Sequence, residues 1–236
     1  SNFITAFILF FIMSPTGSVT DYLLLALAGV IAMASKYILV YHKKHIFNPA
    51  ALGSFVVSFL GLGASWWIGS EALLAPMLVV GFLILRKIRK FTMFFSFLVP
   101  ALIVILIFGY TYKQPLLESL KFAFTSWPLL FLGTIMLTEP LTSPATKKMQ
   151  MVYGAIVGVI TAYQLPIFHF YVTTEFALLV GNVFAFAVNP KWRLKLKLMK
   201  VEKLSNTTNA FLFEKPAGIT FTPGQYMEWT LPHSKS

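Results

Sequence analysis

The chain has 236 residues, a formal net charge of +11 and no cysteine; 57% of its residues are hydrophobic and 11% are charged. This composition, with a mean hydropathy of +0.76, excludes a water-soluble globule with a polar surface. The lack of cysteine excludes disulfides, thiolate metal sites and iron–sulfur clusters. We therefore expect an integral membrane protein.

Apolar runs of roughly 15 to 20 residues follow one another along residues 1–190, and this length suits helices that cross a ~30 Å hydrocarbon core. Eight segments are predicted: 3–13, 22–41, 49–67, 72–85, 92–110, 117–137, 149–164 and 176–188. The predicted fold class is an all-α polytopic membrane bundle of about eight transmembrane helices, followed by a short β-rich segment. Gly154 and Gly158 are spaced like a helix-packing motif of small residues.

The basic residues gather in every second connection between these segments. They are Lys43, Lys44, Arg86, Lys87, Arg89, Lys90, Lys147 and Lys148, followed by a basic tail from Lys191. The opposite connections hold only Lys113, and four acids lie at or near that face: Asp21, Glu71, Glu118 and Glu175. A Lys/Arg bias in short loops sets topology, so the basic connections and the C-terminus are predicted to be cytoplasmic. The charge then reflects membrane topology, and nucleic-acid binding is not expected.

Two unusual loops, "HKKHIFNPAALG" and "MLTEPLTSPATKK", are predicted to open on this same side. Asn48-Pro49 and Ser143-Pro144 each resemble the start of a helix, where unpaired N–H groups and nearby lysines such as Lys36 suit an anion or an electron-rich ring. The competing interpretation is two ordinary helix caps and lysines placed by topology alone. Glu139 stands out because it is the only acid of these inner loops before the tail.

Three stretches carry a family resemblance: "SKYILVYHKKHIFNPAALG", "GTIMLTEPLTSPATKKMQMVYGAIVGV" and "FALLVGNVFAFAVNP". They resemble the RnfD/NqrB family, which supplies membrane subunits to the Rnf electron-transport complex and to the sodium-translocating NADH:quinone reductase. The resemblance covers most of residues 36–190. It implies a bundle of about ten helices that holds flavins, so that two N-terminal helices would be missing from residues 1–190.

The resemblance implies a non-covalent flavin, riboflavin or FMN, in the membrane domain near the Asn-Pro-Ala motif. The positions that it and the loop chemistry indicate are Lys36, His45, Phe47, Asn48 and Pro49, with Thr138, Glu139, Thr142 and Ser143 on the facing loop. His45 would exchange protons with the flavin or simply be solvated. No Ser-Gly-Ala-Thr motif for a covalent flavin occurs at the expected place, so none is predicted; Thr146, in "TSPAT", is the position to check if one is found.

Residues 191–236 change character and alternate basic and apolar residues, which predicts strands. "AFLFEKPAGITFTPGQYMEWTLPH" resembles the start of the FAD-binding barrel of ferredoxin-NADP⁺ reductase-type enzymes. That resemblance implies a truncated reductase domain, whose FAD and NAD(P)H sites would lie in a missing C-terminal part.

The function predicted from these features is electron transfer from a cytoplasmic NAD(P)H reductase domain to a membrane flavin, in a prokaryotic plasma membrane. Lipid surrounds the chain, and a quinone or other electron-transport subunits are the expected partners. The prediction includes no metal site and no catalytic residue. One alternative is a small-solute or ion transporter with a site at Lys36 and Glu139. Another is a plain membrane anchor for a reductase domain.

Overall fold

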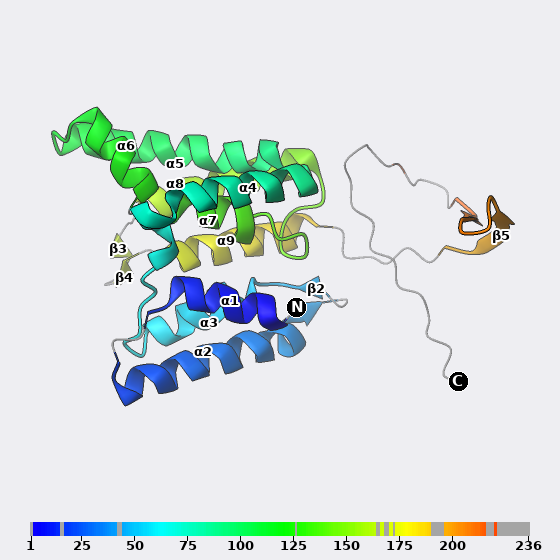
Figure 1. Ribbon diagram of the computed structural model, residues 1–236, viewed down its shortest axis with the longest axis horizontal. Helices are drawn as coiled ribbons and strands as arrows, with labels where there is room; N and C mark the ends of the chain where they lie inside the picture. Colours follow the sequence, from blue (N-terminus) through cyan, green and yellow to red (C-terminus); the bar gives the residue numbers. More distant parts are fainter. Residues whose placement is uncertain are drawn as a thin grey trace. The chain divides into compact units, whose positions relative to one another are not determined.

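The computed structural model describes residues 2–14, 17–41, 44–125, 127–163, 166–167, 170–171, 173–189, 196–215 and 220. The chain forms two compact units, residues 1–189 and 190–236. The described part of the first unit is a bundle of helices (Figure 1), and that of the second is a β-hairpin.

The α-helices of the bundle are α1 (Asn2–Ile12), α2 (Val19–Ile38), α3 (Pro49–Ser58), α4 (Leu74–Ile88), α5 (Phe91–Thr111), α6 (Leu116–Thr125), α7 (Leu129–Phe131), α8 (Lys147–Tyr163) and α9 (Thr174–Val188). Two 3₁₀ turns, η1 (Trp67–Gly69) and η2 (Glu71–Leu73), precede α4, and a π-helix, η3 (Leu132–Met136), continues α7. Two short hairpins pair β1 (Val40–Tyr41) with β2 (Lys44–His45) and β3 (Pro166–Ile167) with β4 (Phe170–Tyr171).

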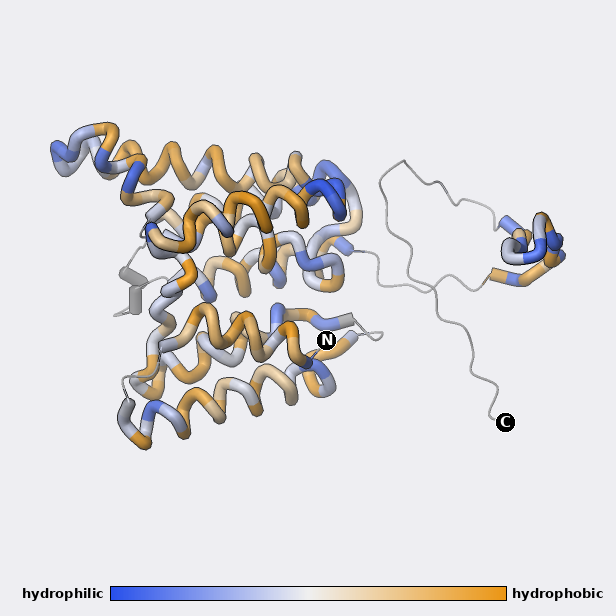
Figure 2. Tube along the Cα trace, viewed as in Figure 1, coloured by the Kyte–Doolittle hydropathy of each residue, from blue (hydrophilic) through white to orange (hydrophobic). Residues whose placement is uncertain are grey.

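Two of the described helices, α2 and α5, are long and apolar enough to cross a membrane alone. The pair formed by α6 and the segment Leu129–Met136 passes the same test together, although the two parts meet at 58°. The shafts of α4 and α5 are hydrophobic along their length (Figure 2), and many of their large apolar side chains are exposed, as expected for contact with lipid. The predicted number of eight spans is not confirmed.

Helix α3 is much shorter than the predicted segment 49–67 because the backbone turns away after Ser58. Gly61 adopts a positive φ of 103°, and the N–H of Leu62 donates to the carbonyl of Val57 at 3.2 Å. This bond closes the helix in the manner of a Schellman motif. The prediction of one helix over 49–67 is therefore wrong beyond Ser58, since apolarity alone does not report where glycine lets the chain reverse.

The predicted helix 117–137 is also interrupted. Pro128 has no N–H to donate and lies between α6 and α7. The chain then continues as η3, and π-helical turns often occur at functional positions. The predicted single span is thus a bent pair of helices that ends just before Glu139.

Helices α5 and α8 have the most extensive contact of the described helix pairs. A Cβ on Gly154 would lie 2.8 Å from the carbonyl oxygen of Met93, and one on Gly158 would overlap the carbonyl of Phe97. Met93 and Phe97 are four residues apart on α5, and the glycines they contact follow in the same order on α8. Helices α5 and α8 therefore run parallel. The predicted packing role of the two glycines is confirmed.

The second unit contains β5 (Leu198–Lys203) and β6 (Asn209–Phe213), which pair antiparallel with a register shift between Leu198 and Lys200. Strands are predicted within residues 191–236, of which residues 191–195, 216–219 and 221–236 lie outside the described part. The assignment of this unit to a reductase-type domain stays a prediction.

Candidate functional site

Four parts of the chain meet at one end of the bundle through buried polar contacts. The side-chain amide of Asn48 donates to Glu139 Oε2 at 2.8 Å. Lys90 Nζ donates to Ser143 Oγ at 2.6 Å, and Asn189 Nδ2 donates to the Ser143 carbonyl at 3.1 Å. The starts of α3 and α5, the loop of residues 137–146 and the end of α9 therefore lie together. Their shared location places the connections that contain Asn48, Lys90, Ser143 and Asn189 at one end of the bundle; the side of the membrane stays a prediction.

Both the side-chain amide and the backbone N–H of Asn48 form hydrogen bonds. Its Oδ1 caps α3 by accepting from the Ala51 N–H at 3.1 Å, while its own N–H donates to Asn182 Oδ1 at 2.8 Å. Pro49 occupies the first turn, where no N–H is needed. The predicted Asn-Pro helix start is confirmed, and Asn48 is only 2% exposed.

Asn182 links the two loops from the middle of α9. It is fully buried, and its Nδ2 donates to the Thr142 carbonyl at 3.3 Å and to Tyr153 Oη at 3.2 Å. This residue was absent from the predicted site. Its signal was available, because a single amide inside the apolar run "FALLVGNVFAF" must find partners if the helix is buried.

Glu139 contributes a half-buried carboxylate at the edge of this network. Its Oε2 accepts hydrogen bonds from Asn48 and, at 3.2 Å, from Thr142 Oγ1. Burial raises the pKa of Glu139, and the two hydrogen bonds together with the charges of Lys36 and Lys90 oppose that increase. The protonation of Glu139 is therefore set by the balance between its burial and the neighbouring hydrogen-bond donors and lysine charges.

Lys90 points into the bundle, although the sequence placed it among the topology-setting cations. Its side chain is buried and donates to the Thr138 carbonyl at 3.2 Å as well as to Ser143. Burial lowers the pKa of Lys90 to about 8, against the opposing charge of Glu139. Lys90 therefore fastens the loop of residues 137–146 to the start of α5.

The stability of the protein is expected to depend on pH through Lys90. The pKa of this lysine falls from 10.5 in a free chain to about 8 in the fold, so the unfolded chain binds more protons between these values. The free energy of unfolding should rise with pH across this window, by on the order of 3 kcal/mol. Thermal unfolding in detergent from below pH 8 to above pH 10.5 measures it. Lys90→Met should lose this rise, and an equal rise in the variant would contradict the assignment.

Ser143 and Pro144 do not begin a helix, contrary to prediction. Helix α8 begins three residues later at Lys147, and Thr146 Oγ1 accepts from the Met149 N–H at 3.4 Å. The hydroxyl of Ser143 is used by Lys90 instead. Ser143 and Thr146 are both residue types that favour helix N-caps. Thr146 accepts from the first turn of α8, whereas the contact with Lys90 engages the hydroxyl of Ser143.

The remaining predicted residues lie around this network. Lys36 donates to Asn2 Oδ1 at 3.3 Å, and the described residues include no ion pair between Lys36 and Glu139. His45 lies in β2 and is half-buried, as is Phe47. His42 and Lys43 lie outside the described residues.

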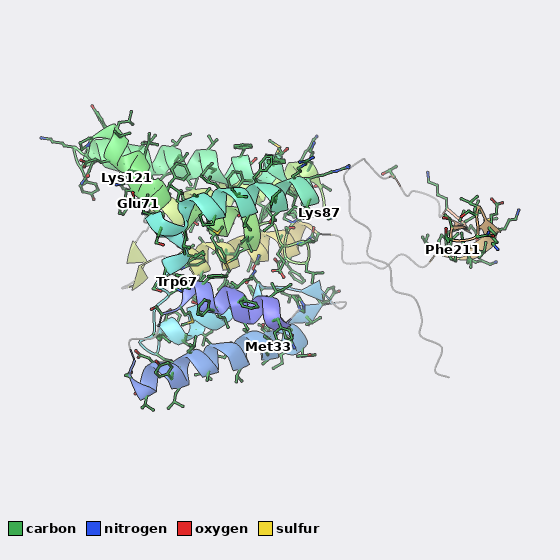
Figure 3. The ribbon with its side chains drawn as sticks, viewed as in Figure 1. Met33, Trp67, Glu71, Lys87, Lys121 and Phe211 are labelled. Carbon is green, nitrogen blue, oxygen red and sulfur yellow. The ribbon has the colours of Figure 1, made fainter. Side chains whose placement is uncertain are left out.

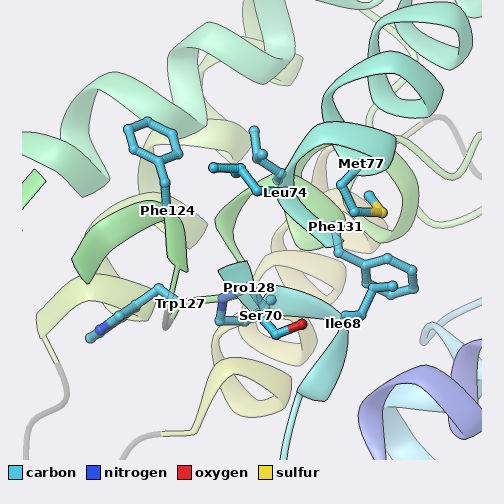
Figure 4. Close-up of a pocket in the computed structure, with 10 residues that line it drawn as sticks. Ile68, Ser70, Leu74, Met77, Phe124, Trp127, Pro128 and Phe131 are labelled. Atoms are coloured by element: carbon cyan, nitrogen blue, oxygen red, sulfur yellow. The ribbon is translucent and has the colours of Figure 1, made fainter. Parts of the chain in front are cut away.

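Little space remains within the network for a ring. Asn48, Thr138, Thr142 and Ser143 are each at most 3% exposed. One cavity of about 480 Å³ lies between α1, α2 and Trp67, and another of about 10 Å³, room for roughly one water, lies at the break between α6 and α7 (Figure 4). The network borders neither of these cavities. Neither cavity offers room for a flat ring at the network, and a flavin there stays a prediction.

A second acid, in the first turn of α9, is buried against α3. Glu175, which the sequence placed at or near the opposite face, is 3% exposed and sits inside the bundle. Its Oε1 accepts from Trp66 Nε1 at 2.9 Å and from Ser54 Oγ at 3.4 Å. No group of three or more His, Cys, Asp or Glu residues that could hold a metal occurs in the described part of the chain.

Comparison with known families supports the resemblance noted in the sequence. The model of the NQR2, RnfD, RnfE family matches residues 2–193. No curated protein and no solved structure matches the chain. Because the family model spans most of the chain, this protein belongs to the NQR2, RnfD, RnfE family, whose members are membrane subunits of electron-transport complexes.

Proposed function

We propose that this chain carries electrons through the membrane by means of a non-covalent flavin, riboflavin or FMN, held at the rim of the polar network. The observation that carries the proposal is the 2.8 Å bond from Asn48 to Glu139, which joins the start of α3 to the loop of residues 137–146. Two segments 91 residues apart thereby form one polar edge with a half-buried aromatic side chain, Phe47, beside it.

The residues at this edge have separate tasks in the proposal. Phe47 offers its face to a flat ring, and Glu139 places a titratable carboxylate near it. Asn48 and Thr142 fix the carboxylate, while the ammonium of Lys90 compensates its charge. A bound flavin would supply the conversion of two-electron to one-electron chemistry.

The wider electron path is also part of the proposal. Electrons would come from NAD(P)H through an FAD-containing reductase domain in the cytoplasm and pass to a quinone or another subunit. The other predicted positions would support the flavin site at this rim: Lys36, His45, Pro49, Thr138, Ser143 and Thr146. The host membrane would be a prokaryotic plasma membrane with the C-terminus of the chain in the cytoplasm.

The proposal is tested by the redox behaviour of Glu139→Gln. The glutamine can still accept from Asn48 but removes a negative charge, so the midpoint potential of the bound flavin should become more positive. Phe47→Ala should weaken flavin binding on the order of fivefold through lost stacking. Spectroelectrochemical titration and flavin release from purified protein measure both changes.

Two controls match these variants. Glu71→Gln removes an exposed carboxylate beside Lys121, far from Lys87 and the basic end of α4 (Figure 3), and should leave the potential unchanged. Phe59→Ala removes an exposed ring beyond the far end of α3 and should not alter flavin content. Equal responses of the variants and their controls would refute a flavin at this rim.

A transporter is the second candidate, and the bent span favours it. Interrupted helices are typical of solute sites in transporters, and a 58° bend breaks the span that leads to the half-buried Glu139. This alternative places the solute between Lys36 and Glu139. It predicts a colourless protein that a transported solute stabilises against heat, with loss of that stabilisation in Glu139→Gln.

A further inference from the structure

Five exposed cations lie at the end of α4 and the start of α8, and the electron-transfer proposal does not use them. This basic patch consists of Arg86, Lys87, Arg89, Lys147 and Lys148, all exposed. None of the five side chains forms a hydrogen bond or an ion pair with a described residue. They therefore present unneutralised charge.

The fold brings the two halves of the patch to one level of the bundle. Lys90 follows Arg89 directly, and its bond to Ser143 ties the α4–α5 turn to the loop that leads into α8. Since α5 and α8 run parallel with Gly154 against Met93, the first turn of α8 extends past the start of α5. Lys147 and Lys148 thus lie at the same level along the helix axes as the α4–α5 turn that carries Arg89.

Helix α4 carries exposed apolar side chains along its length and exposed cations in its last turn. It buries one stripe, at Met77, Gly81 and Leu85, and exposes large apolar side chains elsewhere. Phe82 is 54% exposed and Leu83 is 55% exposed. Arg86 lies four residues after Phe82 and Lys87 four after Leu83, so each cation follows an apolar neighbour on one helix face. Figure 2 shows the change from hydrophobic to hydrophilic where α4 meets α5.

We propose that the basic patch binds a membrane phospholipid with an anionic headgroup. The acyl chains would lie along the exposed side of α4, and the phosphate would be held by Arg86 and Lys87 with support from Arg89, Lys147 and Lys148. Charge complementarity selects this partner, because the five cations are exposed, and the exposed acid Glu71 lies away from Lys87 (Figure 3). The apolar approach favours a lipid over an acidic protein, which would contact only the charged end.

The double variant Arg86→Gln/Lys87→Gln tests the proposal. Native mass spectrometry of the full chain in a mild detergent would compare phosphatidylglycerol with phosphatidylcholine of the same acyl chains. Each removed charge should weaken binding of phosphatidylglycerol about fivefold, so the double variant should lose on the order of twentyfold. Binding of phosphatidylcholine should not change, and added salt should weaken only the binding of phosphatidylglycerol.

Two further proteins make the result decisive. Lys113→Gln/Lys121→Gln removes two exposed cations elsewhere in the bundle and should bind both lipids like the unaltered chain. Arg86→Lys/Lys87→Arg keeps the charges and should retain preference for phosphatidylglycerol. Equal loss in the Lys113/Lys121 control, equal affinity for the two lipids, or salt-sensitive capture of an acidic protein with no lipid preference would each overturn the proposal.

Discussion

Gly158→Ala is expected to lower the free energy of unfolding by about 3 kcal/mol or more, because the added methyl group meets backbone. A Cβ at this position would overlap the carbonyl oxygen of Phe97 on α5, and no flexible side-chain end is there to move aside. The two helices would have to separate along their closest contact, and overpacking of this kind typically costs about 1–3 kcal/mol even where side chains can adjust. Unfolding in mixed micelles with sodium dodecyl sulfate measures the change.

Gly29→Ala is the matched control for this substitution. Gly29 lies inside α2, and a Cβ there would meet nothing within 4 Å. Alanine favours a helix over glycine by about 1 kcal/mol, so this variant should be unchanged or slightly more stable. Similar losses in both variants would show that the contact of α5 with α8 does not hold the bundle together as described.

Asn182→Leu should produce a loss of comparable size, about 3–5 kcal/mol, for a different reason. Leucine fits an apolar helix but leaves the Asn48 N–H, the Thr142 carbonyl and Tyr153 Oη without their partner. Each buried polar group left unsatisfied costs about 1–3 kcal/mol. The same unfolding assay measures the loss of stability.

The control for Asn182 is the next residue of α9. Val183 is 52% exposed, so Val183→Ala removes apolar surface from the outside and should change stability by less than about 1 kcal/mol. A flavin assay on Asn182→Leu adds a second reading, because the network that supports Glu139 would also be lost. A stable Asn182→Leu protein would show that the two loops do not depend on this amide.

The helices that the sequence predicted best are those whose ends are marked by polar residues. Helix α5 begins directly after Lys90 and lies close to the expected segment 92–110. The segments 49–67 and 117–137 failed for the opposite reason. They read as continuous apolar runs, while the reversal at Gly61 and the break at Pro128 depend on backbone angles that hydropathy does not encode.

The site was predictable only in part, and the limit has a physical cause. Asn48 and Glu139 carry local signals, a helix cap and a lone acid beside proline. Lys90 and Asn182 join the network through side-chain directions that depend on how α5 and α9 pack, so local sequence could not distinguish Lys90 from the exposed Arg89. Ser143 was wrongly assigned as a helix start because its tertiary partner was not visible.

The most direct test of the electron-carrier account is the absorbance of the purified chain before and after reduction, followed by denaturation and mass spectrometry of what is released. The account predicts a flavin spectrum that bleaches on reduction and a riboflavin or FMN mass in the soluble fraction after denaturation. A folded protein that is colourless and releases no flavin, with its unfolding transition intact, would contradict it.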